Sequence, residues 1–151
     1  MKKIIARSEL KEIVQRLKAQ NKKIVFTNGC FDILHPGHIR LLRMAKEEGD
    51  VLIVGLNSDS SVSAIKPNRP IIPENERAEV LSALEMVDCV VIFSEAEPTD
   101  LIKEIMPNTL VKGGDWKEDE VKGREFSDKV KLFPYIEKWS TSSIITRCKK
   151  A

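Results

Sequence analysis

The segment that decides the fold spans residues 24–38 and reads IVFTNGCFDILHPGH. It opens with an apolar run typical of a buried strand, and Pro36 is a residue favoured in the first turn of a helix. A strand that turns through a glycine-bearing loop into a helix leaves free backbone N–H groups, which bind anions. The chain's two histidines, His35 and His38, lie at this turn. The segment therefore predicts a strand–loop–helix unit that holds phosphate and carries two imidazoles.

Apolar runs and helical patterns alternate along the rest of the chain. We expect strands at residues 23–27, 51–56, 89–93, 109–112 and 130–133, and helices at 8–20, 36–48, 73–84, 98–105 and 141–149. Several strand candidates are continuously apolar, which is typical of strands covered on both faces. The pattern predicts an α/β fold: a Rossmann-like, doubly wound five-stranded parallel sheet with helices on both faces, plus an extra N-terminal helix. Ser8 is the expected cap of that extra helix, and residues 116–128, rich in charge, are expected to form a mobile surface segment.

Composition is that of an ordinary globular protein. The chain has 151 residues, 42% hydrophobic and 32% charged, with a net charge of +2. A nearly neutral charge argues against nucleic acid or a membrane surface as a partner, and no apolar run approaches the roughly 20 residues of a membrane span. Three widely spaced cysteines without a CxxC pair predict free thiols in a reducing cytoplasm. We expect a single domain, with residues 1–22 as a helical extension and 23–151 as the core.

Polar, basic and glycine-bearing clusters follow the ends of the predicted strands. Ligands of open α/β sheets bind beyond those ends. The sequence lacks both GxGxxG and GxxxxGK[ST], so it carries neither the dinucleotide fingerprint nor the P-loop. Two helix starts, residues 36–38 and 140–143, would instead offer N–H groups and positive dipole ends, with Lys66 and Lys112 adding charge. These features together predict a cradle for a triphosphate.

The motifs at the two helix starts resemble those of a known superfamily. His35-Pro36-Gly37-His38 resembles the HxGH signature of the cytidylyltransferase-like nucleotidyltransferases, and residues 139–144, WSTSSI, resemble their second motif. Within that superfamily the sequence is similar to the D-glycero-β-D-manno-heptose 1-phosphate adenylyltransferase branch. The stretches that carry this similarity are residues 27–35, 57–59 with Lys66, 69–70 with 76–77, and 110–115. The resemblance implies transfer of AMP from ATP to a sugar 1-phosphate, giving ADP-heptose for the lipopolysaccharide core and pyrophosphate.

The resemblance also implies roles for single residues and for partners. The catalytic residues would be His35, His38 and Lys66. The nucleotide would be bound by Cys30, Phe31, His35, Gly37, His38, Lys112, Gly113, Asp115, Ser140, Thr141, Ser142 and Ser143. The sugar phosphate would be bound by Asp32, Asp59, Lys66 and Arg77. Mg²⁺ would be held mainly through the ATP phosphates, with no protein metal site, and the protein would be a homodimer supplied by a separate heptose kinase.

Other interpretations stay open on the residues alone. A cytidylyltransferase acting on glycerol 3-phosphate or a phosphorylated amino alcohol would use the same cradle, since the sequence does not show which base is read. A non-catalytic nucleotide-binding module is a second alternative. A zinc site built on both histidines and Cys30 is a third, although zinc usually takes four ligands or three and a water. Asp59 and Asp115 are equally suited to turns, and Arg69 reads as a simple loop charge.

Overall fold

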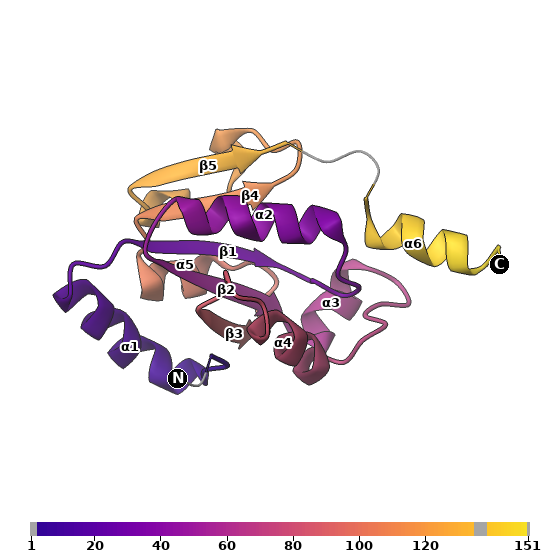
Figure 1. Ribbon diagram of the computed structural model, residues 1–151, viewed down its shortest axis with the longest axis horizontal. Coiled ribbons are helices and arrows are strands. Elements are labelled where there is room, and N and C mark those ends of the chain that lie inside the picture. Colours follow the sequence, from indigo (N-terminus) through magenta and orange to yellow (C-terminus); the bar gives the residue numbers. More distant parts are fainter. Residues whose placement is uncertain (1–2, 135–138, 151) are drawn as a thin grey trace.

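The computed structural model describes residues 3–134 and 139–150. Its core is a five-stranded sheet in the order β3-β2-β1-β4-β5, with every neighbouring pair parallel (Figure 1). The strands are β1 (Ile24–Gly29), β2 (Val51–Asn57), β3 (Cys89–Phe93), β4 (Thr109–Gly113) and β5 (Lys129–Phe133). The α-helices are α1 (Arg7–Ala19), α2 (Pro36–Glu47), α3 (Asp59–Ile65), α4 (Glu74–Ser82), α5 (Thr99–Ile105) and α6 (Thr141–Cys148). This arrangement confirms the predicted doubly wound α/β fold.

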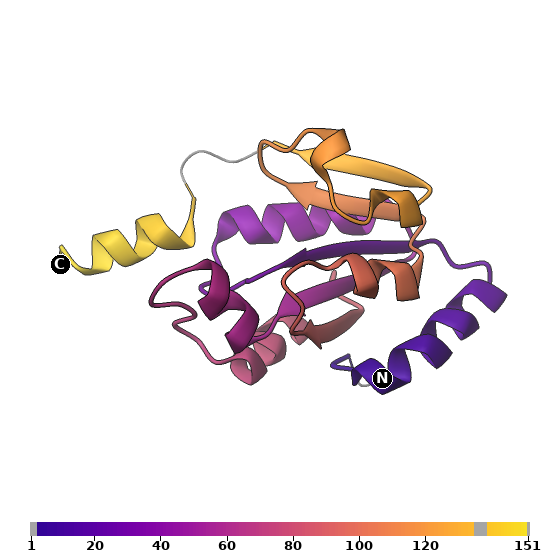
Figure 2. The same ribbon diagram turned by 180° about the vertical axis from the view of Figure 1, so that it is seen from behind.

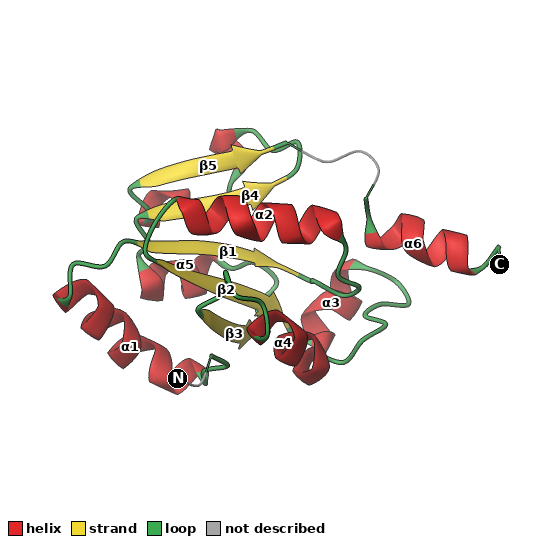
Figure 3. Ribbon diagram, viewed as in Figure 1, coloured by secondary structure: helices red, strands yellow, loops and turns green. Residues whose placement is uncertain are grey.

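Helices cover both faces of the sheet (Figure 3). Successive residues of a strand point to opposite faces, so Phe26 and Val25 of β1 enter different cores. Helices α1 and α5 cover the first face, and their buried residues are Leu10, Val14, Leu101, Ile102 and Ile105. Helices α2 and α4 cover the second face with Leu42, Ala45, Ala78 and Leu81. The extra N-terminal helix α1 is thus part of the hydrophobic core.

The two edge strands of the sheet, β3 and β5, are protected in different ways. At β3, Val90 donates its N–H to the Lys3 carbonyl at 2.8 Å, and Ile5 donates its N–H to the Val90 carbonyl at 3.0 Å. The segment around Ile4 therefore pairs in parallel with the outer side of β3. At β5, Lys129 and Lys131 place their ammonium groups 2.7 and 3.7 Å from the Glu48 carboxylate. One edge is paired with backbone, and the other carries charge.

Three local expectations are corrected by the structure. Helix α1 begins after Ala6 rather than Ser8, because the Glu9 carboxylate accepts the Ala6 N–H at 2.9 Å and satisfies the helix start. Helix α3 occupies a stretch that was not expected to be helical. Residues 116–128 contain two 3₁₀ turns, Glu118–Glu120 and Arg124–Phe126, and Val121 between them is 3% exposed in the first core. That segment is therefore anchored to the core and is not a free surface loop.

The strand order fixes where a ligand can enter. The chain runs from β1 outward to β2 and β3 and then crosses back to β4, so the order reverses between β1 and β4. The loops after β1 and β4 consequently separate and leave a crevice at the carboxyl ends of the strands. Helix α6 lies beyond these ends, away from both helical layers, in the two opposite views (Figures 1 and 2). Among the described residues, no helix is long and apolar enough to cross a membrane.

Candidate active site

The crevice at the carboxyl ends of the strands holds a cavity of about 540 Å³. Its walls come from the loops after β1, β2 and β4, from the start of α2 and from the start of α6. The lining includes these predicted site residues: Cys30, Phe31, His35, Gly37, His38, Lys66, Lys112, Gly113, Ser140, Thr141 and Ser142. The histidine motif and the serine/threonine motif are about 100 residues apart in the sequence. They nevertheless face the same cavity.

The two imidazoles are stacked against each other. Their ring centroids are 3.8 Å apart, with 23° between the ring planes. His35 caps helix α2, because its Nδ1 accepts the N–H of Gly37 at 3.1 Å. A neutral ring that accepts at Nδ1 carries its proton on Nε2. The cap therefore fixes the tautomer of His35 and leaves Nε2–H as the donor for a ligand.

The surroundings of His38 disfavour its charged form. Burial, followed by the adjacent His35 and the charge of Lys66, lowers the pKa of His38 to about 4. Burial also lowers the pKa of His35. Nδ1 of His38 is buried and has no hydrogen-bond partner among the described residues. Because an orphaned N–H is rarer in proteins than an orphaned acceptor, this favours the proton on Nε2 here as well.

Phe31 packs beside His38 of the histidine pair. Its ring centroid is 5.2 Å from that of His38, and the side chain is only 4% exposed. Its φ of 42° lies in the left-handed region that non-glycine residues rarely adopt. Backbone strain of this kind persists where the surroundings hold the residue in place, and it is concentrated at functional sites. The strained turn places an aromatic ring beside His38 in the cavity lining.

The cavity lining also carries a half-buried lysine. The Lys112 ammonium donates to Oδ1 of Asn28 at 2.5 Å and lies 6.0 Å from the Trp116 ring centroid. Burial lowers the pKa of Lys112 to about 8. The group is therefore still mostly cationic at pH 7, and no carboxylate pairs with it in the described structure. It is a charge available to an anion entering the cavity.

The start of α6 is tied to the histidine loop. Ser140 caps the helix by accepting the Ser143 N–H at 3.0 Å, and the Thr141 hydroxyl donates to the Ile33 carbonyl at 3.3 Å. A methyl group on Gly37 would lie 3.4 Å from Cβ of Trp139, so the two helix starts approach each other closely. Their N–H groups can then bind one polyphosphate from two sides.

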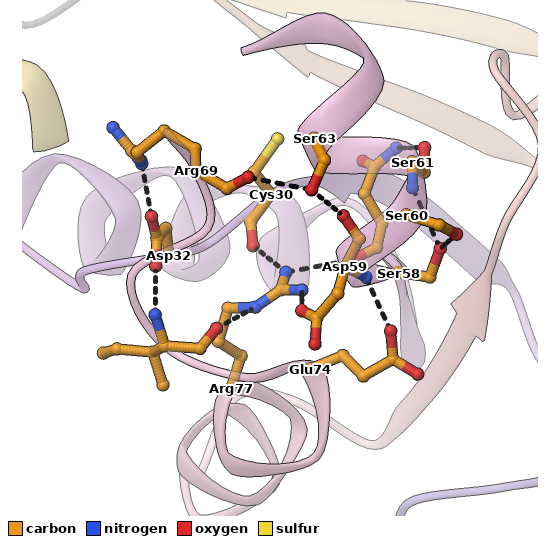
Figure 4. A network of polar contacts seen from close by, with 12 residues as sticks. Cys30, Asp32, Ser58, Asp59, Ser60, Ser61, Ser63, Arg69, Glu74 and Arg77 are labelled. Atoms are coloured by element: carbon orange, nitrogen blue, oxygen red, sulfur yellow. Dashed lines mark hydrogen bonds and ion pairs between the residues drawn. The ribbon is translucent and has the colours of Figure 1, made fainter. Parts of the chain in front are cut away.

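A network of polar contacts holds the loop between α3 and α4 against the loop after β1 (Figure 4). Arg77, 1% exposed, donates to the carbonyl oxygens of Ile72, Cys30 and Asn57 and to the Asp59 carboxylate. The carboxylate of Asp32 accepts from Arg69 and from two backbone N–H groups of the same loop. These contacts shape the cavity wall from behind.

Some predicted ligands do not reach the cavity surface. Asp32, Asp59, Arg77, Asp115 and Ser143 are absent from its lining within the described residues. Their predicted contacts with the nucleotide or the sugar stay predictions, whereas Asp32 and Arg77 are observed to join the two loops. The structure adds lining residues that sequence reasoning missed, among them Asn28, Asn57, Arg69 and Trp116. The position of Asn28 and Asn57, each at or near the carboxyl end of a strand, was the available signal.

The lining also bears on how a divalent cation would be held. None of the described residues around the cavity is an aspartate or glutamate, and the described part of the chain has no cluster of three or more His, Cys, Asp or Glu that could hold a metal. Mg²⁺ prefers oxygen ligands and commonly binds through substrate phosphates. The donor set of this cavity suits a metal that arrives bound to a nucleotide.

Comparison with known proteins identifies the family. Residues 26–147 match the Cytidylyltransferase-like family. The bifunctional protein HldE of Sulfurimonas denitrificans is 52% identical over 142 residues, which cover 93% of this chain and 30% of that protein. The HldE protein of Helicobacter pylori is 49% identical over 142 residues, or 93% and 31% of the two chains. The chain thus spans about three-tenths of the length of these relatives.

Solved structures agree with this assignment. A lipopolysaccharide core biosynthesis protein from Thermoplasma volcanium superposes with a TM-score of 0.61 at 29% identity, covering 76% of this chain and 96% of that one. A pantoate-β-alanine ligase from Francisella tularensis reaches 0.60 at 18% identity, covering 97% and 76%, and shares the fold alone. The segment matched by the family includes most of β1, the histidine turn, Lys66, Lys112 and the serine/threonine start of α6. The chain is a member of the cytidylyltransferase-like family.

Proposed function

We propose that this protein transfers AMP from ATP to D-glycero-β-D-manno-heptose 1-phosphate, giving ADP-heptose and pyrophosphate. The observation that carries this proposal is the shared cavity, in which two stacked histidines, two helix starts and two lysines surround one space. Such a set of donors fits a triphosphate better than any uncharged ligand. The heptose acceptor is supported by the similarity to HldE and to the lipopolysaccharide core biosynthesis protein.

In the proposed reaction an oxygen of the sugar phosphate attacks the α-phosphorus of ATP. The bond from that phosphorus to the bridging oxygen breaks, and pyrophosphate leaves on the opposite side. The nucleophile is already anionic, so no residue has to remove a proton from it. Catalysis then consists of positioning the two substrates and stabilising charge on the phosphate oxygens.

The residues divide this work between them. His35 and His38 would donate from Nε2 to the α-phosphate and to the leaving group, where charge increases in the transition state. The N–H groups and hydroxyls at the start of α6 would hold the β- and γ-phosphates. Mg²⁺ bound through the phosphate oxygens would neutralise part of their charge. Lys66 would contact the α-phosphate or the acceptor phosphate.

A pyrophosphate-release screen tests the proposal. Purified protein with Mg²⁺ is given ATP or CTP, each combined with heptose 1-phosphate or glycerol 3-phosphate. We expect release with ATP and heptose 1-phosphate. Turnover only with CTP and glycerol 3-phosphate would replace the proposal by the cytidylyltransferase alternative. An absence of turnover in all four combinations, with ATP still bound, would favour a non-catalytic nucleotide-binding module.

The setting of the enzyme is proposed on the same basis. The free cysteines Cys30, Cys89 and Cys148 are consistent with a reducing cytoplasm. We also propose a single domain with residues 1–22 as its extension, a homodimer, and a heptose kinase that supplies the sugar phosphate. Sedimentation analysis tests the dimer, and a coupled assay with a heptose kinase that phosphorylates the anomeric hydroxyl tests the supply.

A further inference from the structure

We propose that Arg69 is a fixed ligand for the phosphate of the acceptor and that Asp32 is the positioning residue that aims it. This inference deepens the proposed adenylyl transfer and rests on it. It concerns the half of the cavity that lies toward β2, whereas the histidines and α6 account for the triphosphate.

The setting of Arg69 differs from that of a simple loop charge. Its side chain is only 9% exposed, yet the residue lines the cavity. Its Nε donates to Oδ2 of Asp32, and within residues 3–134 and 139–150 no other group is recorded as accepting from its guanidinium. Figure 4 shows one edge of the guanidinium on Asp32 while its other end points away from that carboxylate. A guanidinium has five N–H donors, so four of them stay available to a ligand.

Asp32 is held rigidly and has little capacity left for a ligand. Its Oδ1 accepts the N–H groups of Ile71 and Ile72, both at 2.9 Å, and its side chain is fully buried. Burial by itself would raise the pKa of this carboxyl, but the Ile72 and Ile71 N–H groups and Arg69 outweigh it and lower the pKa. Asp32 therefore stays ionised and fixes both the loop and the guanidinium. We infer that Asp32 orients Arg69 and does not itself bind sugar hydroxyls.

The sheet topology separates the cations of the cavity into two groups. Lys112 lies near the carboxyl end of β4 on one side of β1, whereas Lys66 and Arg69 follow β2 and α3 on the other side. The histidines follow β1 and lie between these groups. The start of α6 is bonded to the histidine loop and, with Lys112, supplies donors for the triphosphate. A second anion, the phosphate of the acceptor, would then be bound by Lys66 and Arg69 on the β2 side.

In-line chemistry requires the same separation. The attacking phosphate must approach the α-phosphorus opposite to the departing pyrophosphate. If pyrophosphate leaves toward α6, the acceptor phosphate enters from the side of Lys66 and Arg69. The planar fork of arginine binds two phosphate oxygens at once and fixes their direction, which a lysine cannot do. Pre-orientation by Asp32 also removes the entropy cost of ordering this long side chain on binding.

The test separates the affinity for acceptor from the affinity for ATP. Arg69→Gln, Arg69→Lys and the control Arg16→Gln, an exposed arginine of α1, are compared in pyrophosphate release with heptose 1-phosphate varied at saturating ATP and then the reverse. We expect Arg69→Gln to raise the KM for heptose 1-phosphate by about 10- to 100-fold, while the KM for ATP changes less than about twofold. Arg69→Lys should give an intermediate rise, and the control none.

Asp32→Asn provides an independent variant. It removes the charge that orients Arg69 but leaves the arginine in place, so it should also raise the KM for heptose 1-phosphate without a comparable rise for ATP. An equal rise for both substrates, or no change in either, would overturn the inference. Urea unfolding of each variant identifies loss of fold, and Arg69→Lys, which keeps the charge beside Asp32, serves if the Gln variant does not fold.

A failure of the proposed function gives a different result. If the wild-type protein releases no pyrophosphate from ATP with heptose 1-phosphate, that function is wrong. The role of Arg69 is then judged by calorimetric titration of inorganic phosphate into protein saturated with a non-hydrolysable ATP analogue. Phosphate binding at least about tenfold weaker in Arg69→Gln supports a phosphate ligand, and equal binding rejects it.

Discussion

The histidine pair shows how position alone can set the protonation of a side chain. Two imidazoles stacked at 3.8 Å cannot both be charged without repulsion, and burial lowers the pKa of each. Both rings are therefore neutral near pH 7 in the free protein. A neutral imidazole still donates from one nitrogen, and the cap at Gly37 selects Nε2 in His35. The site thus offers aligned hydrogen-bond donors without the electrostatic cost of two buried cations.

Removing one of these donors should slow the chemical step. We expect His38→Ala to lower kcat by on the order of 10²–10³, because its donor acts where charge increases in the transition state. The measurement is the initial rate of pyrophosphate release at saturating substrates. Circular dichroism and the urea midpoint establish that the variant is folded. Turnover near the wild-type value in a folded His38→Ala protein would remove His38 from the mechanism.

Lys112 should make nucleotide binding depend on pH. Because burial lowers its pKa to about 8, the ammonium loses its charge as the pH rises through that value. A phosphate binds the charged form, so the KM for ATP should be lowest below pH 8 and should rise between pH 8 and 9.5. Lys112→Arg keeps its charge over this range. Its KM should therefore stay flat with pH, and a flat profile in the wild-type protein would contradict this role for Lys112.

At the scale of elements, helix α4 organises the wall of the site from outside the cavity lining. Its Arg77 extends into the protein and donates to the carbonyl of Cys30 after β1, to that of Asn57 at the end of β2, and to that of Ile72 in the loop before α4. A helix that covers the second core thereby joins three loops behind the cavity. The same side chain neutralises Asp59, so little of its charge is available to a substrate.

Arg77→Met should therefore destabilise the fold. It leaves several buried carbonyls without a donor, and we expect a loss of about 3–5 kcal/mol in the free energy of unfolding. The measurement is urea denaturation at pH 7 followed by circular dichroism. The matched control is Arg16→Met, at an exposed position of α1, which should stay within about 0.5 kcal/mol of wild type. A loss below about 1 kcal/mol for Arg77→Met would show that water replaces the guanidinium.

The helices and strands that were predicted from the sequence are those with a clear pattern of apolar residues. The continuous apolar runs of β2 and β3 are typical of strands covered on both faces, and these strands occur where expected. Helix α3 was missed because its sequence, DSSVSAI, is short and rich in serine, which favours turns. It is stabilised by local contacts, the Ser58 cap and the Asn57–Ser61 hydrogen bond at 2.9 Å, so the capping serine was the available signal.

As with the helices and strands, the part of the candidate site that could be predicted is the part marked by local sequence motifs. His35, Gly37 and Ser140 stand in motifs with fixed local geometry, so their convergence on one cavity followed from the strand order. Arg69 gave no such signal, because its function depends on a carboxylate 37 residues earlier in the chain. Conversely, Asp32 lies inside the decisive segment, but the sequence could not show that the loop after α3 covers it.

At the scale of the whole molecule, the cavity joins residues from both halves of the sheet but offers no acidic side chain from its described lining. Magnesium should therefore bind together with ATP and not before it. We expect calorimetry to detect no Mg²⁺ binding to the free protein at millimolar concentration, and EDTA to abolish pyrophosphate release. Addition of excess Mg²⁺ should restore the rate. Tight binding of Mg²⁺ to the nucleotide-free protein would contradict this prediction.

The two edges of the sheet have a consequence for the behaviour of the protein at high concentration. Open strands are templates for intermolecular β-pairing, which leads to amyloid-like assembly. Here the segment around Ile4 occupies the rim of β3, and the lysines of β5 make self-association on the other side electrostatically unfavourable. Chains that lack residues 1–6 should expose the unpaired edge of the apolar strand β3. We expect these chains to bind thioflavin T and precipitate, while the intact chain stays in solution.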